Sequence, residues 1–423
     1  MREIVITGVG VVSPIGIGRE AFWASLEAGR SGVRAVSTLN DDCWPVHIGG
    51  EVVDFDPKRF VRPRKSLKVM SPEIRFAYAA ADLACSDGQL DVDGMNNERL
   101  GVVFGADMIY CNLEDIISAF RGCLVDGKFD YSQWGEHALS ELHPLWMLKY
   151  LPNMPACHIG IARNARGPTN SIILSEASSL SAIGEGVRVI ERNQADAMIV
   201  GGAGARIHPT SISFRGDKLV SRSNGDPSRA CRPFDAERNG IVNGEGAGAF
   251  LIEDRQHAEH RGAKVLARVL GYASRFEPFQ NDGEMTGRAI RDSIDSALRA
   301  SGLAADAIGH VNANGLSTPM HDRIEAQAIR DRLGDVPVTA LKSYFGDLGA
   351  GTGAVEAVGS VLALEQGRIP ATLNYENPDE ACPVNVVHGK PQPMKYPTAL
   401  LLNQSTSGQA VALVIASEDF ANG

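Results

Sequence analysis

The feature that most constrains the fold is the alternation of short apolar runs with helical patterns in both halves of the chain. The strand-like segments are residues 4–8, 100–105, 171–174, 197–200, 248–252, 265–273, 308–312, 384–388, 399–403 and 411–416. The helix-like segments are residues 19–28, 71–85, 177–191, 286–301 and 321–333, with a small-residue helix ending near 366. Strands that alternate with helices predict a layered α/β fold.

Two helix starts in this pattern resemble each other. Leu174-Ser175-Glu176-Ala177-Ser178-Ser179 ends a strand and opens a helix, and Lys342-Ser343-Tyr344-Phe345-Gly346-Asp347 leads into another. Each has a serine, then an acid, then a run of small residues. The likeness predicts an internal duplication, which we divide into an N-terminal half, residues 1–254, and a C-terminal half, residues 255–423.

Local signals complete this picture. Ser71 can cap the helix that follows it. The glycine-dense stretches 201–204 and 240–248 predict turns in which backbones approach closely. Residues 110–150 are the least regular part of the chain and predict excursions around a core.

Composition excludes several classes of protein. The net charge of −10 argues against a nucleic-acid-binding protein. The seven cysteines form no CxxC pair and no disulfide framework, so we expect reduced thiols. The N-terminus lacks the design of a signal peptide, and no apolar run reaches the roughly 18 residues of a membrane span. We therefore expect a soluble cytoplasmic protein that does not enter membranes.

Cofactor motifs are missing as well. The ten histidines show no HExxH or other ligand spacing, and the glycine clusters follow no GxxxxGK[ST] pattern. Neither a metal nor a nucleotide phosphate is implied, and we expect no cofactor.

Six stretches, taken in order along the chain, resemble the β-ketoacyl-ACP synthases of the thiolase superfamily. They are Val5-Ile6-Thr7-Gly8-Val9-Gly10-Val11-Val12-Ser13-Pro14, Leu151-Pro152-Asn153-Met154, Arg232-Pro233-Phe234-Asp235, Gly244-Glu245-Gly246-Ala247-Gly248, Ser317-Thr318-Pro319, and Lys342-Ser343 with Gly346. The resemblance implies a duplicated five-layer α-β-α-β-α fold, usually dimeric. It also implies condensation of an acyl thioester with malonyl-ACP by a cysteine, at a strand-to-helix turn (the elbow), and two histidines.

The resemblance assigns these three catalytic positions to other residues here. Glu176 stands at the cysteine, Asn314 at the first histidine and Asp347 at the second, while Lys342 and Glu356 remain at the family's spacing. The C-terminal loop that holds an oxyanion-hole amide and a gating phenylalanine in the family is rewritten, and its corresponding residues are Ser405, Thr406, Ser407 and Gly408. Since a carboxylate cannot replace a thiolate nucleophile, we expect an acyltransferase-family chain without condensing activity.

Two functional readings follow. In the first, the chain is a partner subunit that resembles the chain-length factors of fatty-acid or polyketide assembly. In the second, Glu176 and Asp347 perform acid–base chemistry as a hydrolase, lyase or decarboxylase, because two close carboxylates raise the pKa of one of them. Cys157 and Cys231 are poor substitute nucleophiles, since neither lies at an elbow.

Each site residue also has a purely structural reading. Glu176 could cap its helix, Asp347 could pair with Lys342, and Asn314 could fill the space of an imidazole. We expect His321, which opens a helix after Pro319, to be an exposed or capping residue.

One basic run stands out in this acidic chain. It comprises Lys58, Arg59, Arg62, Arg64, Lys65 and Lys68. The run is either a solvated face or a dock for an acidic acyl carrier protein, for which the resemblance favours Arg64, Lys65 and Lys68. The family resemblance further implies that the chain forms a homodimer or a heterodimer with an active ketosynthase.

Overall fold

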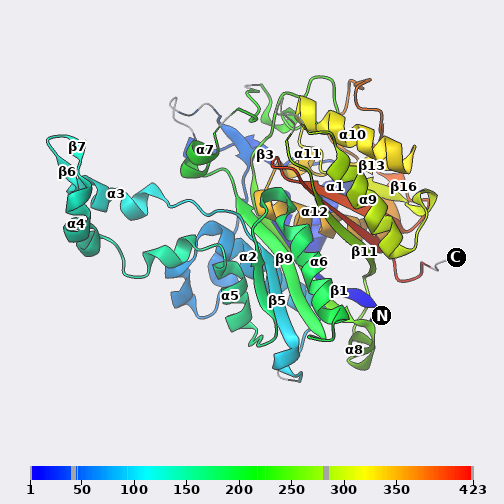
Figure 1. Ribbon diagram of the computed structural model, residues 1–423, viewed down its shortest axis with the longest axis horizontal. Coiled ribbons are helices and arrows are strands. Elements are labelled where there is room, and N and C mark those ends of the chain that lie inside the picture. Colours follow the sequence, from blue (N-terminus) through cyan, green and yellow to red (C-terminus); the bar gives the residue numbers. More distant parts are fainter. Residues whose placement is uncertain are drawn as a thin grey trace.

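The computed structural model describes residues 2–39, 44, 46–92, 94–216, 218–223, 225–279 and 285–420 (Figure 1). Cys43 lies outside these residues. None of the helices in these ranges combines the length and the hydrophobicity that a membrane-spanning segment requires.

The strands form two half-sheets with the same internal order. The first runs β8 (Thr169–Ile172), β5 (Leu100–Gly105), β9 (Ala197–Ala205), β10 (Glu245–Asp254) and β1 (Ile4–Ser13). The second runs β13 (Pro337–Thr339), β12 (His310–Asn312), β17 (Thr398–Gln404), β18 (Gln409–Ala416) and β11 (Ala267–Phe276). In each half the first two pairings are parallel and the next two antiparallel. The predicted duplication and α/β class are confirmed.

The half-sheets meet where β1 pairs with β11, and β15 (Asn385–Val386) extends the second half beyond β13. Shorter elements surround them: α1 (Arg19–Glu27), β2 (Gly16–Ile17), β3 (Val33–Ala35), β4 (Ile48–Gly50), α7 (Pro209–Arg215), α8 (Arg255–His260), α11 (Lys342–Phe345), β14 (Arg368–Ile369) and β16 (Gln392–Pro393).

Helices complete five layers. The central pair, α6 (Ser178–Glu191) and α12 (Thr352–Gln366), packs against strands of both halves. The outer helices are α2 (Pro72–Asp87) and α5 (Met154–Ala162) on the first half, and α9 (Arg288–Ser301) and α10 (Pro319–Leu333) on the second. Figure 1 shows α2 and α6 on opposite sides of β5 and β9. Because α12 is buried from Thr352 to Leu364, it needs an apolar surface all round.

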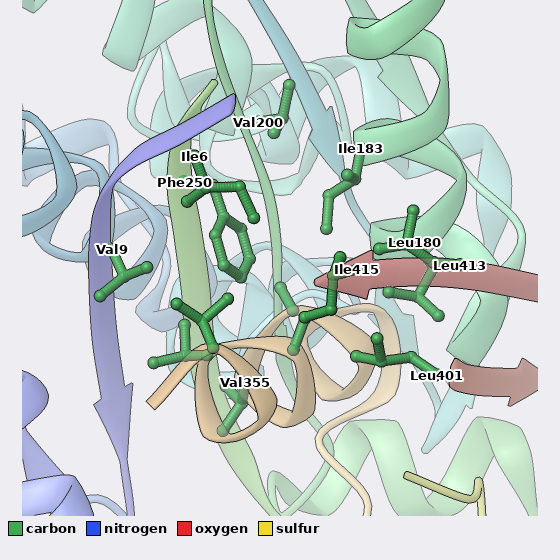
Figure 2. Packing of buried hydrophobic residues seen from close by; sticks show 14 of the residues in the cluster. Ile6, Val9, Leu180, Ile183, Val200, Phe250, Val355, Leu401, Leu413 and Ile415 are labelled. Atoms are coloured by element: carbon green, nitrogen blue, oxygen red, sulfur yellow. The ribbon is translucent and has the colours of Figure 1, made fainter. Parts of the chain in front are cut away.

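The main core joins the two halves. Figure 2 shows residues from β1, β9 and β10 of the first half packed with residues from β17 and β18 of the second, with α6 and α12 between them. The labelled residues are Ile6, Val9, Leu180, Ile183, Val200, Phe250, Val355, Leu401, Leu413 and Ile415. The central helices therefore start inside a rigid, close-packed region.

Two local expectations were wrong. Residues 201–204 lie inside β9 and residues 245–248 inside β10 rather than in turns, whereas the close backbone approach expected of these glycines is observed. A Cβ added at Gly202 would lie 2.3 Å from the carbonyl oxygen of Ala350, and one at Gly204 would lie 2.1 Å from that of Leu348. Ser71 occupies the N-cap position of α2 but makes no capping hydrogen bond through its side chain.

The irregular stretch forms an arm that projects from the body (Figure 1). It contains α3 (Leu113–Gly122), β6 (Leu124–Val125), β7 (Lys128–Phe129) and α4 (Trp134–Glu141). Phe120, Phe129 and Trp134 pack together at its tip. The arm thus has a small apolar cluster of its own, separate from the main core.

A buried histidine in β12 predicts acid sensitivity. His310 is fully buried, neither ring nitrogen has a hydrogen-bond partner within the described chain, and burial lowers its pKa to about 4. Near neutral pH the ring is uncharged in both the folded and the unfolded chain. Below about pH 6.5, the usual pKa of histidine, the unfolded chain binds a proton that the folded chain does not yet bind. The free energy of unfolding therefore falls by about 3 kcal/mol as the pH drops towards 4.

We expect His310→Leu to flatten this loss. Urea unfolding at pH 7 and pH 4.5 measures it, and His260→Leu, at an exposed position, is the control. An unchanged pH dependence in His310→Leu would contradict the prediction.

Candidate functional site

The elbow after β8 has a constrained backbone. Ser175 adopts a left-handed φ of 54°, and the 3₁₀ turn Ser175–Ala177 follows it into α6. The second half repeats this arrangement, because Gly346 has a φ of 74° and precedes Asp347 before α12. Glu176 and Asp347 are 2% and 1% exposed. Both carboxylates therefore lie near the N-terminal ends of the central helices, where partial positive charge stabilises them.

Arg206 lies between these carboxylates, and sequence reasoning missed it. Its Nη1 donates hydrogen bonds both to Glu176 Oε1 and to Asp347 Oδ2. Its Nη2 donates to Asp107 Oδ2 at 2.9 Å and to Ser175 Oγ at 2.8 Å. The only signal was a lone charged residue directly after the glycine-rich strand β9.

Arg206, Glu176, Asp347, Asp107 and Arg215 form one ion cluster, which extends towards the surface through Asp107. Arg215 Nη2 lies 2.5 Å from Asp107 Oδ1. Burial opposes the charge of Asp107, but Arg206 and Arg215 hold its pKa below the usual range. Burial likewise opposes the charge of Arg206, and Asp347, Glu176 and Asp107 raise its pKa. Three carboxylates with two guanidinium groups leave one excess negative charge, which disfavours an anionic ligand.

These contacts correct three expectations. Glu176 is no helix cap, since α6 has no side-chain capping bond. Asp347 pairs with Arg206 and not with Lys342, and its Oδ1 accepts from Thr352 Oγ1 at 2.9 Å. The two carboxylates do not face each other alone, because the shared guanidinium nitrogen offsets their repulsion. The sequence did not indicate this cation between the two carboxylates.

Lys342 forms a second cluster with the residue at the first histidine position. Its Nζ donates to Asn314 Oδ1 and Glu356 Oε1, each at 3.0 Å. Asn403 Nδ2 donates to Glu356 Oε2 at 3.0 Å, while burial raises the pKa of Glu356 to about 7 despite Lys342. Asn314 is thus hydrogen-bonded in place and not a passive filler.

The rewritten loop closes the hairpin between β17 and β18, which pack against the elbow. Ser405 Oγ and Ser407 Oγ lie 2.7 Å apart. Gly408 has a φ of 100°, and a Cβ there would lie 2.1 Å from the carbonyl oxygen of Glu277. The roles of Ser405, Thr406, Ser407 and Gly408 stay predictions.

Three other residues named from the sequence are His321, Cys157 and Cys231. His321 is 5% exposed and contacts Thr318 Oγ1 at 3.0 Å, and burial lowers its pKa; the expectation of an exposed or capping histidine was wrong. Cys231 is buried, which raises the pKa of its thiol, and Cys157 lies on α5. In the described ranges no group of three or more histidine, cysteine or acidic side chains could hold a metal ion.

The basic run lies on the 3₁₀ turns Pro57–Arg59 and Arg64–Val69 and between them. All six basic side chains are exposed. The run is therefore accessible to an acidic partner.

The duplicated half-sheets, the two buried central helices and the strand-to-helix elbow together define a thiolase-like ketosynthase fold. Residues 1–258 match the family "Beta-ketoacyl synthase, N-terminal domain", and residues 266–376 match "Beta-ketoacyl synthase, C-terminal domain". The chain belongs to the β-ketoacyl synthase family.

Relatives and solved structures agree with this assignment. The 3-oxoacyl-[acyl-carrier-protein] synthase 2 of Synechocystis is 32% identical, with 97% of each chain covered. The tetracenomycin polyketide synthase ketoacyl synthase alpha subunit of Streptomyces glaucescens is 32% identical over 98% of this chain and 97% of its own. The ishigamide ketosynthase/chain length factor matches with a TM-score of 0.84 and 28% identity, covering 98% of this chain and 99% of that one.

Proposed function

We propose that this chain is a non-condensing subunit of fatty-acid or polyketide assembly that acts like a chain-length factor on acyl-ACP. One observation carries the proposal: the residue at the nucleophile position, Glu176, is buried and ion-paired to Arg206. A carboxylate held in this way offers neither a thiolate nor an open position for an acyl group.

The ion cluster also weighs against the repurposed enzyme. Glu176 and Asp347 both accept hydrogen bonds from one nitrogen of Arg206. Either carboxylate could take a proton from a substrate only by giving up its charge-assisted hydrogen bond to the guanidinium group. Purified protein should therefore not hydrolyse, dehydrate or decarboxylate acyl thioesters. Turnover that disappears in Glu176→Gln would favour the repurposed enzyme instead.

A partner subunit is supported by the exposed apolar side chains of the arm. Leu113, Phe120 and Phe129 are more than 40% exposed. Apolar patches of this kind mark interaction surfaces in soluble proteins. Two structural neighbours are described as a ketosynthase/chain length factor and as an acyl-carrier protein in complex with its ketosynthase.

Co-expression with a cysteine-bearing ketosynthase encoded beside this chain tests the proposal. We expect a stable complex whose product length changes when this subunit is exchanged. A protein that only self-associates, never binds the ketosynthase and leaves product length unchanged would overturn it.

Carrier-protein binding gives a separate prediction. We expect Lys65→Glu with Lys68→Glu to weaken binding of an acidic carrier protein about tenfold or more at low salt, because charge complementarity is lost. Adding Arg64→Glu should weaken it further. Titration of labelled carrier protein measures the effect, and Lys390→Glu, at an exposed position in the other half, is the control. Equal affinities for all these variants would leave the basic run as a solvated face.

A further inference from the structure

We infer that the ion cluster at the elbow fixes the surface that binds the partner ketosynthase, so that Asp107 and Arg206 act as positioning residues for assembly. The inference rests on the proposed function, because the partner ketosynthase is the one that the proposed function requires. It gives the residues at the altered catalytic site a task outside catalysis.

Asp107 connects the cluster to the arm. It lies two residues after the end of β5, and its carboxylate binds Arg206 on one side and Arg215 on the other. Its Oδ1 also accepts a hydrogen bond from Met108 N at 3.0 Å. Met108 is 59% exposed and leads into the arm. The direction in which the arm leaves the body is therefore set by a buried carboxylate.

Aromatic contacts strengthen this connection. The rings of Tyr110 and Phe214 are stacked, with centroids 5.0 Å apart and an interplanar angle of 4°. The guanidinium of Arg215 lies 5.8 Å from the Tyr110 ring centroid while it binds Asp107. Phe214 is 73% exposed. The first residues of the arm and helix α7 thus present one joint apolar surface anchored on Asp107.

Arg206 fixes a second segment of the same surface. Its Nη2 donates to Ser175 Oγ, and Ile173 and Leu174, just before Ser175, are exposed. Strand β8 precedes them at one end of the sheet, where β5 is its hydrogen-bonded neighbour in the sheet order. An edge strand of this kind offers backbone groups to another chain. One guanidinium therefore orders both the sheet edge and, through Asp107, the arm.

Charge favours a different subunit over a second copy as the occupant. Residues 111–150 carry six acidic and three basic side chains, a net charge of −3, in a chain whose total is −10. A second copy brings more negative charge to this surface, whereas a ketosynthase with a basic facing surface complements it. The occupant we assign is such a ketosynthase, with cysteine at its own elbow.

Asp107→Asn is the decisive variant. The amide keeps the shape of the side chain, and the two guanidinium groups then balance Glu176 and Asp347, so no excess buried charge remains. Asp254→Asn is the matched control, because the Asp254 side chain is also buried, at 8% exposed, and is ion-paired to Arg2. Asp254 lies far from the cluster along the sheet. It ends β10, whereas Arg206 follows Ala205, the partner of Glu245 at the start of β10.

Two measurements test the inference. We expect Asp107→Asn to weaken binding of the cysteine-bearing ketosynthase at least about tenfold, equivalent to about 1.4 kcal/mol, with Arg215→Ala acting in the same direction and Asp254→Asn unchanged. Hydrogen exchange in residues 108–150 should accelerate while α6 and α12 stay protected. Asp107→Glu should restore part of both effects.

The outcomes separate the two proposals. If the wild-type chain binds no ketosynthase, the proposed function fails, and unchanged arm exchange in Asp107→Asn would overturn the inference as well. If the wild-type chain binds and Asp107→Asn binds equally well, the inference alone is wrong.

Discussion

Condensation of acyl and malonyl thioesters by the purified chain is expected to be at least about 10²-fold slower than by a ketosynthase that carries cysteine at its elbow. Removing the nucleophile of a covalent enzyme lowers the rate by about 10⁶, and acid–base assistance returns only about 10²–10⁴. Glu176 cannot compensate, because Arg206 binds its carboxylate. Release of CO₂ from malonyl-ACP and of the free carrier-protein thiol from acyl-ACP measures the reaction.

Restoring the family's triad should not be sufficient. Glu176→Cys, Asn314→His and Asp347→His together leave Arg206 buried beside a new histidine, with Asp107 as its remaining carboxylate from the cluster. We expect activity only when Arg206 is also replaced by a small residue. The unmodified chain serves as the control for contaminating host synthases. Ready turnover by the unmodified chain, lost in Glu176→Gln, would show that a carboxylate performs the chemistry.

Removing the guanidinium group of Arg206 should destabilise the fold strongly. Breaking a buried ion pair by deleting one partner lowers the free energy of unfolding by about 3–5 kcal/mol, because the other charge stays buried without compensation. In Arg206→Met, Glu176 and Asp347 both lose their counter-ion. Urea unfolding followed by circular dichroism measures the loss.

A partly exposed arginine provides the comparison. Arg99 pairs with Asp196, and their side chains are 29% and 26% exposed, so Arg99→Met should lower the unfolding free energy by only about 1 kcal/mol or less. Adding Glu176→Gln and Asp347→Asn to Arg206→Met should recover much of the lost stability, since it removes the uncompensated charges. Equal stabilities for Arg206→Met and Arg99→Met would show that the cluster is not the source of stability we assign to it.

The periodicity of apolar residues predicted the order of strands and helices, because a buried strand or helix shows its burial as a pattern in its own local sequence. Residues 100–105, expected as a strand, form β5 over the same span, and the elbow before α6 lies where the sequence placed it. The glycines of residues 201–204 do not mark a turn, because carbonyl groups of segments distant in sequence approach them too closely for a side chain. Such contacts have no signature in the neighbouring sequence.

The expected pair of Lys342 and Glu356 is present, with Nζ and Oε1 3.0 Å apart. The counter-ion of Glu176 and Asp347 could not be assigned from sequence for a similar reason, because it depends on distances between separate strands. Arg206 comes after β9 and Asp107 after β5, and the parallel pairing of these strands brings the two together. The arm is a second example, since a segment without a continuous core gives no clear period to detect.

The half-sheets share one order, yet their contributions to the site have diverged. Ser405 follows β17 in the second half as Arg206 follows β9 in the first, so one repeat supplies a cation where the other supplies a hydroxyl. The second repeat in turn supplies Asp347, whose counter-ion comes from the first. The two halves of the duplicated fold therefore supply different groups to the site and are no longer interchangeable. Expressed alone, the second repeat would carry Asp347 without the guanidinium group that neutralises it in the whole chain.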